Sequence, residues 1–413
     1  RLGGAVATRQ ASMAYRVLAV CTGLNVVSRG VAESFAVFLL PLSMAFSASR
    51  AETTLAYSSF MLVLGLCSPL TGWAVDRFGP RRVYQLGIAL CACACLSASF
   101  APSLIMVYAS IGLLLPFGVS GMGTIAASNL VSRWFRSGLS TAMGLLAAAL
   151  GTGILIFAPL SQTLVEWLGW RDAYRALALL LAAIWLLQFL LPWQRMRAEA
   201  SMAESALTVP VATPSLGFAA LLQMASRTPL FWALFGIMFV TSVSTYAVTV
   251  QLVAYLVSAG MTPLHAAWVF GATGLASILG MLGAGHLARQ WGEVRVASIS
   301  YAATVLGLLS LGLFEHLPHV GFLVFYVLLF GTMQGSRGPL VAVLAARGFA
   351  GANQSTMYGL VLIGMGLGGA LGSWASAALF DWFQSYQAMM MLSAAAAVSG
   401  YAIFWRMKTW NKA

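Results

Sequence analysis

Long apolar runs, separated by short polar stretches, follow one another along the whole chain. Each run is almost free of charge and has the length of about 20 residues that a helix needs to cross a bilayer. The short alternating segments of a β-barrel do not occur. We therefore predict an all-α membrane protein with twelve transmembrane helices. Their predicted positions are 17–46, 53–75, 83–100, 104–131, 138–165, 173–192, 228–258, 264–287, 296–314, 320–346, 353–379 and 386–405.

A polar stretch at 193–227 separates the sixth apolar run from the seventh. It predicts a cytoplasmic linker between two six-helix bundles, at 1–192 and 228–413. Internal repetition supports this division, because GWAVDRFGPRRV at 72–83 aligns with GHLARQWGEVRV at 285–296. Parallel six-helix repeats are one known plan for transporters, in which the substrate site lies near the midplane between the repeats.

The charge of the chain supports the membrane assignment and gives an orientation. Charged residues make up 8% of the sequence, against about 25% in a soluble globular protein. With the N-terminus placed in the cytoplasm, seventeen of the 22 Lys and Arg residues face the cytoplasm and three, Arg50, Arg171 and Arg175, face outward. This asymmetry predicts that both termini are cytoplasmic. The net charge of +12 then reflects topology, and we expect no nucleic-acid partner.

The sequence shows no pattern typical of an enzyme or a metal site. The five cysteines all fall within predicted helices, and Cys91, Cys93 and Cys95 are two residues apart. A helix spreads residues at that spacing over different faces, unlike the ligands of a zinc site. No nucleophile and base occur together in the spans. We therefore expect neither enzymatic activity nor a cofactor or metal.

The loop after the second span has a distinctive sequence, GWAVDRFGPRR at 72–82. It resembles the loop 2–3 signature of the major facilitator superfamily, and the resemblance extends over essentially the whole chain. It implies two pseudo-symmetric six-helix bundles that alternate access to a central site. It also implies that Asp76 latches the two halves on the cytoplasmic side, although the charges could serve only to anchor topology. The expected gating residues are Gly72, Asp76, Arg77, Gly79, Arg81 and Arg82.

Three further stretches of sequence indicate a particular branch of that superfamily, although the resemblance is weaker. SRWFRSGLSTAMGLLAAALGTG at 132–153, GWRDAY at 169–174 and FSASRAETTLAYSSFMLVLG at 46–65 resemble the monocarboxylate and oxalate–formate carriers. The chain departs from these carriers because it has no buried charge in helices 8 and 11. It also lacks the helix 4 arginine that proton-driven drug exporters carry. The resemblance implies a small organic anion as substrate without naming it.

Three charged residues remain within the spans: Arg29 and Glu33 in the first helix, and Arg337 in the tenth. A charge at a helix centre costs roughly 2.5–3.5 kcal/mol on the translocon scale, so we expect these residues to line a polar cavity. Asn25 shares a helix face with Arg29 and Glu33, and Gln334 shares one with Arg337. The nearby Gly335, Gly338 and Pro339 predict an interrupted tenth helix. The two arginines could then face each other across the cavity.

Uncharged aromatic residues complete the candidate site. Tyr57, Tyr246 and Tyr358 lie near the middle of their spans and could contact the substrate, although such a residue is more often a packed aromatic or a helix–helix hydrogen bond than a ligand. An alternative for Arg29 and Glu33 is a mutual ion pair that only neutralises itself. That alternative leaves Arg337 without a partner.

These residues predict a proton-coupled symporter for a small mono- or dicarboxylate. Arginine binds carboxylates through its planar fork, and protonation of Glu33 would release Arg29 to bind the anion. Three alternatives remain: an anion exchanger with a permanently charged Glu33, an exporter of amphipathic compounds, and a receptor that transports nothing. The expected partners are the anion, protons and membrane lipid. We expect a monomer in a plasma membrane, specifically a bacterial inner membrane.

Overall fold

The computed structural model describes residues 2–135, 139–190, 218–349 and 354–410, without the side chains of a few positions that include Asp76 and Arg133. The twelve predicted transmembrane helices are confirmed, since the described residues contain twelve helical stretches that are long and apolar enough to cross a membrane. These stretches are Met13–Phe46, Arg50–Val75, Pro80–Ser99, Leu104–Ser132, Thr141–Leu168, Trp170–Leu190, Pro229–Ser258, Pro263–Trp291, Glu293–His316, Val320–Ala345, Met357–Phe383 and Gln387–Met407.

The first six spans are built from helices α1 to α9 and two short non-α segments. The fourth span contains a π-helical segment, η1, in which the hydrogen bonds skip one more residue than in an α-helix. The bounds are α1 Leu2–Glu33, α2 Phe35–Phe46, α3 Arg50–Phe78, α4 Pro80–Ser99, α5 Leu104–Val107, η1 Tyr108–Leu114, α6 Leu115–Met122, α7 Thr124–Trp134, α8 Leu139–Leu168, α9 Trp170–Leu187 and η2 Gln188–Leu190.

The last six spans repeat this pattern, again with a π-helical segment, η3, in the fourth of them. A helix outside the spans, α11, occupies the end of the predicted linker, and 191–217 lie outside the described residues. The bounds are α11 Phe218–Arg227, α12 Pro229–Thr249, α13 Leu252–Ser258, α14 Pro263–Trp291, α15 Glu293–His316, α16 Val320–Tyr326, η3 Val327–Gly331, α17 Thr332–Gly348, α18 Gln354–Phe383 and α19 Gln387–Trp410.

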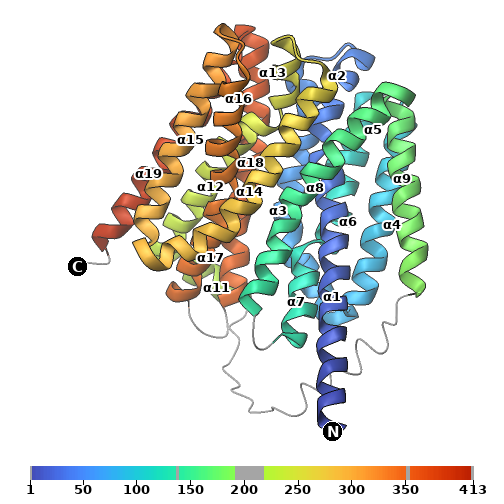
Figure 1. Ribbon diagram of the computed structural model, residues 1–413, viewed down its shortest axis with the longest axis vertical. Helices are drawn as coiled ribbons and strands as arrows, with labels where there is room; N and C mark the ends of the chain where they lie inside the picture. The colour runs from blue at the N-terminus through green and yellow to red at the C-terminus, as the bar shows by residue number, and fades with distance from the viewer. Residues whose placement is uncertain (1, 136–138, 191–217, 350–353, 411–413) are drawn as a thin grey trace.

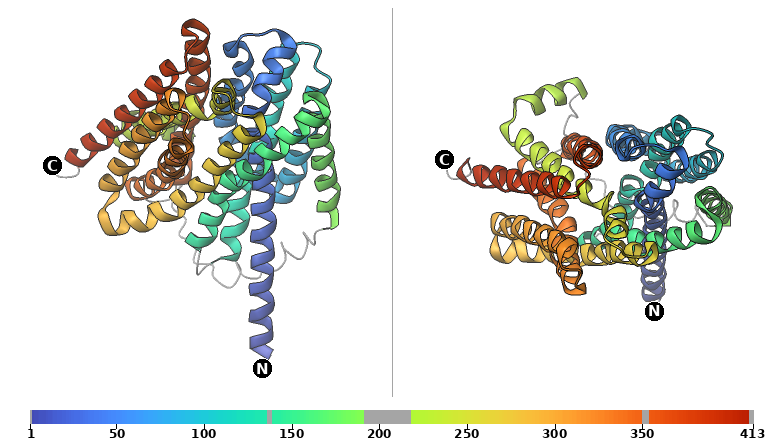
Figure 2. Two further views of the ribbon diagram at one scale, coloured as in Figure 1. Left: turned by 45° about the horizontal axis from the view of Figure 1, so that its top comes forward. Right: turned by 90° about the horizontal axis from the view of Figure 1, so that it is seen from above.

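The helices form two groups that lie side by side. Figures 1 and 2 show the first six spans in blue to green beside the last six in yellow to red. One hydrophobic cluster is built almost wholly from the first six spans, and a second from the last six together with α11. A third joins the groups, since it includes Val37 and Ile154 from the first and Leu252 and Phe270 from the second. We call them the N-terminal and C-terminal groups.

Two helix pairs carry much of the contact between the groups: α3 with α18, and α8 with α14. Glycines allow the close approach in the first pair. A Cβ atom added to Gly65 would lie 3.0 Å from Cα of Gly366, a distance that a larger side chain could not keep without moving the helices.

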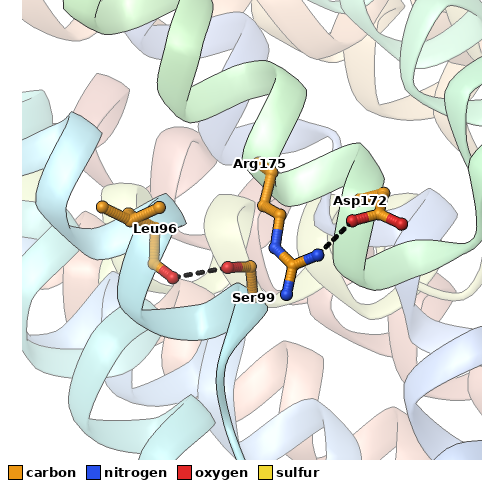
Figure 3. A network of polar contacts seen from close by, with 4 residues as sticks. All are labelled: Leu96, Ser99, Asp172 and Arg175. Atoms are coloured by element: carbon orange, nitrogen blue, oxygen red, sulfur yellow. Dashed lines mark hydrogen bonds and ion pairs between the residues drawn. The ribbon is translucent and has the colours of Figure 1, made fainter.

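Arginines on the side that the charge asymmetry assigns to the outside anchor the start of α9. Arg171 donates a hydrogen bond to the carbonyl of Ala101 at 2.9 Å. Arg175 forms an ion pair with Asp172 beside the end of α4, where Ser99 donates to the carbonyl of Leu96 (Figure 3). This pair is half-exposed, and exposed pairs contribute about 0–1 kcal/mol to stability. The pair therefore helps to position the helix end and adds little to stability.

Candidate functional site

The first span is interrupted next to Glu33. Helix α1 ends at Glu33 and α2 begins at Phe35, with Ser34 between them. The hydroxyl of Ser34 donates to the carbonyl of Gly30 at 2.6 Å, a bond that tends to bend a helix. Pro41 further along lacks the N–H that an intact helix would use. These features place the carboxylate of Glu33 at a local break in the helix.

Glu33 is buried and bonded to Tyr57. Its side chain is 4% exposed, and its Oε2 accepts a hydrogen bond from the Tyr57 hydroxyl at 2.8 Å. Its Oε1 is buried and has no hydrogen-bond partner among the described residues. The Tyr57 ring stacks on Phe35, with ring centroids 5.5 Å apart. One carboxylate oxygen of Glu33 is therefore held in place, and the other remains available to a proton.

Arg29 and Tyr246 complete this cluster. The half-buried Arg29 lies one helical turn before Glu33, and its charge acts on Glu33, Tyr57 and Tyr246. Tyr246 comes from α12 in the C-terminal group, and its ring centroid lies 6.1 Å from that of Tyr57. The structure thus brings together four of the predicted site residues, from both groups of helices.

The ion pair between Arg29 and Glu33, the alternative interpretation of these residues, is not formed in this conformation. Within the described part of the chain, the ion pairs are Arg175–Asp172 and Arg347–Glu293. No hydrogen-bond partner is found there for the Arg29 guanidinium either. Its donors are therefore not taken up by any described neighbour.

Asn25 is directed to a different part of the N-terminal group. Its Nδ2 donates to the carbonyl of Leu146 at 3.0 Å and to Oγ1 of Thr124 at 3.4 Å. These bonds connect α1 with α8 and α7. Asn25 Oδ1 is buried without a hydrogen-bond partner among the described residues. The amide donors of Asn25 thus connect helices in this conformation, two turns away from Glu33.

The contacts of Arg337 lie within the C-terminal group, so this conformation does not join it to the Arg29 cluster. The residue is 1% exposed, and all its polar contacts are with α15. Its Nε donates to Oγ of Ser300 at 2.9 Å, and its Nη2 donates to the Ser300 carbonyl and to Oγ1 of Thr304. The guanidinium also lies over the Tyr301 ring, 4.1 Å from its centroid. One face of the guanidinium and its Nε and Nη2 donors are therefore engaged inside the C-terminal group.

The helix around Arg337 also differs from its prediction. Helix α17 continues through Pro339 to Gly348, and the non-α segment of this span is η3, which ends before Gln334. Gln334 and Tyr358 are half-buried in α17 and α18, and Tyr358 packs against the core of the C-terminal group. In the described part of the chain, neither forms a hydrogen bond with Arg29 or Glu33.

The loop between the second and third spans turns at Gly79. Its φ of +80° lies in a region that favours glycine, and the aligned Gly292 of the second repeat has nearly the same φ of +83°. Arg77 lies over the rings of Trp73 and Phe78, and Arg81 and Arg82 are exposed. A Cβ atom on Gly72 would meet nothing within 4 Å, so no helix approaches closely there.

The side chain of Asp76 lies outside the described residues, and so do those of Arg133 and Arg136, the basic residues at the next turn on the same side of the chain. The second repeat shows what such a loop can do. There Glu293, directly after Gly292, pairs with Arg347 at the end of α17 at 2.5 Å. An acidic residue of the loop thus bonds to the end of the tenth span on the side that the charge asymmetry assigns to the cytoplasm.

A row of polar residues on α3, not predicted from the sequence, bonds to the C-terminal group. Thr54 Oγ1 accepts a hydrogen bond from Nε2 of Gln251 at 3.1 Å, and the hydroxyls of Ser58 and Ser373 lie 2.8 Å apart. Both bonds join the N-terminal to the C-terminal group. The signal was available in the sequence, because Arg50, Thr54 and Ser58 recur every four residues and so share a helix face.

Comparisons with known proteins agree with this architecture. The sequence model of the major facilitator superfamily matches residues 18–336 and 258–412. The uncharacterized MFS-type transporter YcxA of Bacillus subtilis (strain 168) is 26% identical over 86% of this chain and 85% of its own length. Monocarboxylate transporter 11 of Homo sapiens is 30% identical over 94% of this chain and 81% of its own length. Monocarboxylate transporter 13 of Rattus norvegicus is 28% identical over 91% and 84%.

Twelve spans, a repeated loop signature and the match to the family over nearly the whole chain lead to the same assignment. The likeness to monocarboxylate transporters 11 and 13 also covers most of the chain. The protein is an integral membrane protein, not an enzyme, and it belongs to the major facilitator superfamily of secondary transporters.

Proposed function

We propose that this transporter carries a small organic anion, a mono- or dicarboxylate, together with a proton. The observation that carries the proposal is the cluster of Arg29, Glu33, Tyr57 and Tyr246 between the two groups of helices. It combines one cationic side chain, one acidic side chain and two phenols. The names of the mammalian relatives, monocarboxylate transporters, support the same class of substrate.

Arg29 is the proposed anchor for the anion. A guanidinium binds a carboxylate through two parallel hydrogen bonds, which are stronger than bonds between neutral groups. The Arg29 donors have no described hydrogen-bond partner, whereas those of Arg337 are engaged by Ser300 and Thr304. We therefore propose that Arg29, and not Arg337, binds the anion in this conformation. Arg337 would join the site only in a conformation that releases it from α15.

Glu33 is the proposed proton carrier. When Glu33 is ionised, its charge competes with the substrate anion for Arg29. When it is protonated, that competition is lost and the anion binds more tightly. Binding of the anion then favours protonation by the same factor, because coupling between two ligands is reciprocal. Transport of the two together follows if only the doubly loaded and the empty carrier change conformation readily.

The cytoplasmic loop is proposed to act in the conformational step. Its acidic residue Asp76 would latch the two groups on the inner side, and Gly79 provides the tight turn. Arg77, Arg81 and Arg82 would hold the loop at the membrane surface, where exposed positive charges are favourable on the cytoplasmic side. Gating of this kind changes the transport rate and leaves the binding site unaltered.

The binding part of this proposal is tested by a thermal-shift screen of the purified protein against carboxylates, sulfonates, phosphonates and sugars. A ligand that binds only the folded state raises the apparent melting temperature. We expect carboxylates to stabilise the parent, more strongly at lower pH, and to stabilise Arg29→Ala much less at the same concentration. Stabilisation by neutral amphipathic compounds alone would instead favour an exporter. An exchanger would show flux that requires a counter-substrate and does not respond to a pH difference.

A further inference from the structure

The outer ends of α3 and α18 are joined by a carboxylate bound to a helix terminus. Asp381 of α18 accepts hydrogen bonds from the backbone N–H of Arg50 at 3.0 Å and of Ala51 at 2.7 Å. These are the first two residues of α3. The first amides of a helix have no partner within the helix, and the positive end of the helix dipole attracts a carboxylate. The contact links the C-terminal group to the N-terminal group.

The cap of α3 leaves these two amides for a partner outside the helix. Ser49 Oγ accepts from the amide of Glu52 at 3.2 Å, and Glu52 Oε2 accepts from the amide of Ser49 at 2.8 Å. This reciprocal capping box stays within one helix end. It does not reach the amides of Arg50 and Ala51. Asp381 completes the set of bonds only when the two groups are together on the outer side.

Asp381 is poorly placed within its own helix. It lies in the last turn of α18, which ends at Phe383, and a negative charge there opposes the dipole of that helix. The N-terminus of α3 supplies the compensating positive potential. The Arg50 guanidinium adds a contact in the same region, because it lies over the Phe380 ring at 5.3 Å from the centroid. Separation of the groups would remove all of these favourable interactions at once.

The contact continues inward along one face of α3. Thr54 bonds to Gln251, and Ser58 bonds to Ser373, both across the two groups. On the same face, Tyr57 holds Glu33. These hydrogen bonds between the two groups form a row along α3, which we call the closed row. The Asp381 contact lies at its outer end, and the Arg29–Glu33 cluster lies at its inner end.

We propose that Asp381 is an outer clamp, which bonds the N-terminus of α3 in the outward-closed conformation and releases it in the outward-open one. The amides of Arg50 and Ala51 become hydrated when the clamp opens. The strength of the clamp therefore sets how much of the protein is open to the outside. Asp381 does not touch the proposed binding cluster, so it acts on the conformational equilibrium and on the transport rate. This proposal requires alternating access and is independent of which anion is carried.

The test measures how often the outer side opens in the absence of substrate. Ser58 is buried in the closed row of bonds, and a cysteine placed there reacts with a reagent from outside only when the row opens. The background is Cys93→Ser with Ser58→Cys, because Cys93 is the exposed one of the native cysteines. A membrane-impermeant maleimide is added to whole cells, and the labelling rate is compared with that of the same protein lacking Ser58→Cys. Asp381→Asn removes the charge of the clamp.

We expect the cysteine at position 58 to be labelled roughly three- to thirtyfold faster in Asp381→Asn than in the parent. The reason is that the variant loses one favourable charge at the N-terminus of α3. Asp381→Glu, which keeps the carboxylate, should label at nearly the parent rate and show that the Asn variant has not simply misfolded. Glu52→Gln is the matched control, because it removes one carboxylate from the same helix end without crossing the groups. Equal labelling of Asp381→Asn and the parent would overturn the proposal. Equal acceleration in Glu52→Gln would overturn it as well.

Discussion

The hydroxyl of Tyr57 lies 2.8 Å from Oε2 of Glu33 and donates a hydrogen bond to it, although the two residues come from different helices. A phenol can donate to a carboxylate and to the carbonyl oxygen of a carboxylic acid alike. Glu33 can therefore gain or lose a proton at Oε1 without breaking this bond. The relationship fixes the position of the acidic group while leaving its charge variable, as a coupling residue requires.

Removal of this bond should lower stability. Tyr57→Phe keeps the ring that stacks on Phe35 but leaves the buried Glu33 side chain without its donor. A buried polar group left unsatisfied costs about 1–3 kcal/mol. Tyr246→Phe is the control, because its ring lies in the same cluster and no described residue bonds to its hydroxyl. The melting temperatures of the two purified variants measure the two effects. An equal decrease in melting temperature would mean that the Tyr57–Glu33 hydrogen bond does not contribute to stability.

Arg29 should determine anion affinity. We expect Arg29→Ala to weaken carboxylate binding by roughly tenfold to a hundredfold, since hydrogen bonds to charged groups contribute about 1.5–3 kcal/mol. Arg29→Lys keeps the charge and loses the planar fork, so its affinity should fall between those of the parent and Arg29→Ala. Isothermal titration with the best carboxylate from the screen measures all three. Unchanged affinity in Arg29→Ala would remove this residue from the binding site.

Arg337 should contribute mainly to folding in the conformation described here. Arg337→Ala removes the buried hydrogen bonds that the guanidinium donates to Ser300 and Thr304, and a hydrogen bond to a charged group contributes about 1.5–3 kcal/mol. Arg289→Ala, at an exposed position on α14, is the control and should change stability by less than about 0.5 kcal/mol. Thermal unfolding compares them. A normally stable Arg337→Ala that no longer binds the anion would instead support the substrate contact predicted from the sequence.

Asp76 should affect the rate of transport and leave the affinity unchanged. Asp76→Asn removes the charge of the expected cytoplasmic latch, and its place at the end of α3 is far along the helix from Tyr57. We expect initial uptake rates to fall severalfold while the dissociation constant measured at equilibrium stays the same. A large loss of affinity together with a normal rate of conformational exchange would contradict a latch and favour a direct effect on the site.

The fold could be predicted because membrane helices are specified by local sequence. An apolar run of sufficient length must form a helix in lipid, where every backbone group needs a partner, and the distribution of charges gives the orientation. The cluster of Arg29 and Glu33 could also be predicted, because a charge inside a span is costly and rarely without function. These arguments concern one helix at a time.

The contacts between helices could not be predicted in this way. The spacing of Gln334 and Arg337 defines a face of α17, but it does not say which neighbour that face meets. The structure directs Arg337 to Ser300 and Thr304, which are four residues apart on α15 and form a matching polar face. Asp381 was overlooked for the same reason, since its partners are backbone amides of a helix more than 300 residues away.

The coupling role of Glu33 is the central claim, and it is tested by flux measurements on Glu33→Gln in proteoliposomes. The amide has nearly the size of the carboxyl group, can still accept the Tyr57 hydrogen bond, and cannot take up a proton. We expect this variant to bind the anion with weaker pH dependence and to exchange substrate across the membrane. When a proton gradient is imposed, it should fail to accumulate substrate, whereas the parent should concentrate it. Accumulation equal to that of the parent would contradict the account and assign proton coupling to another group.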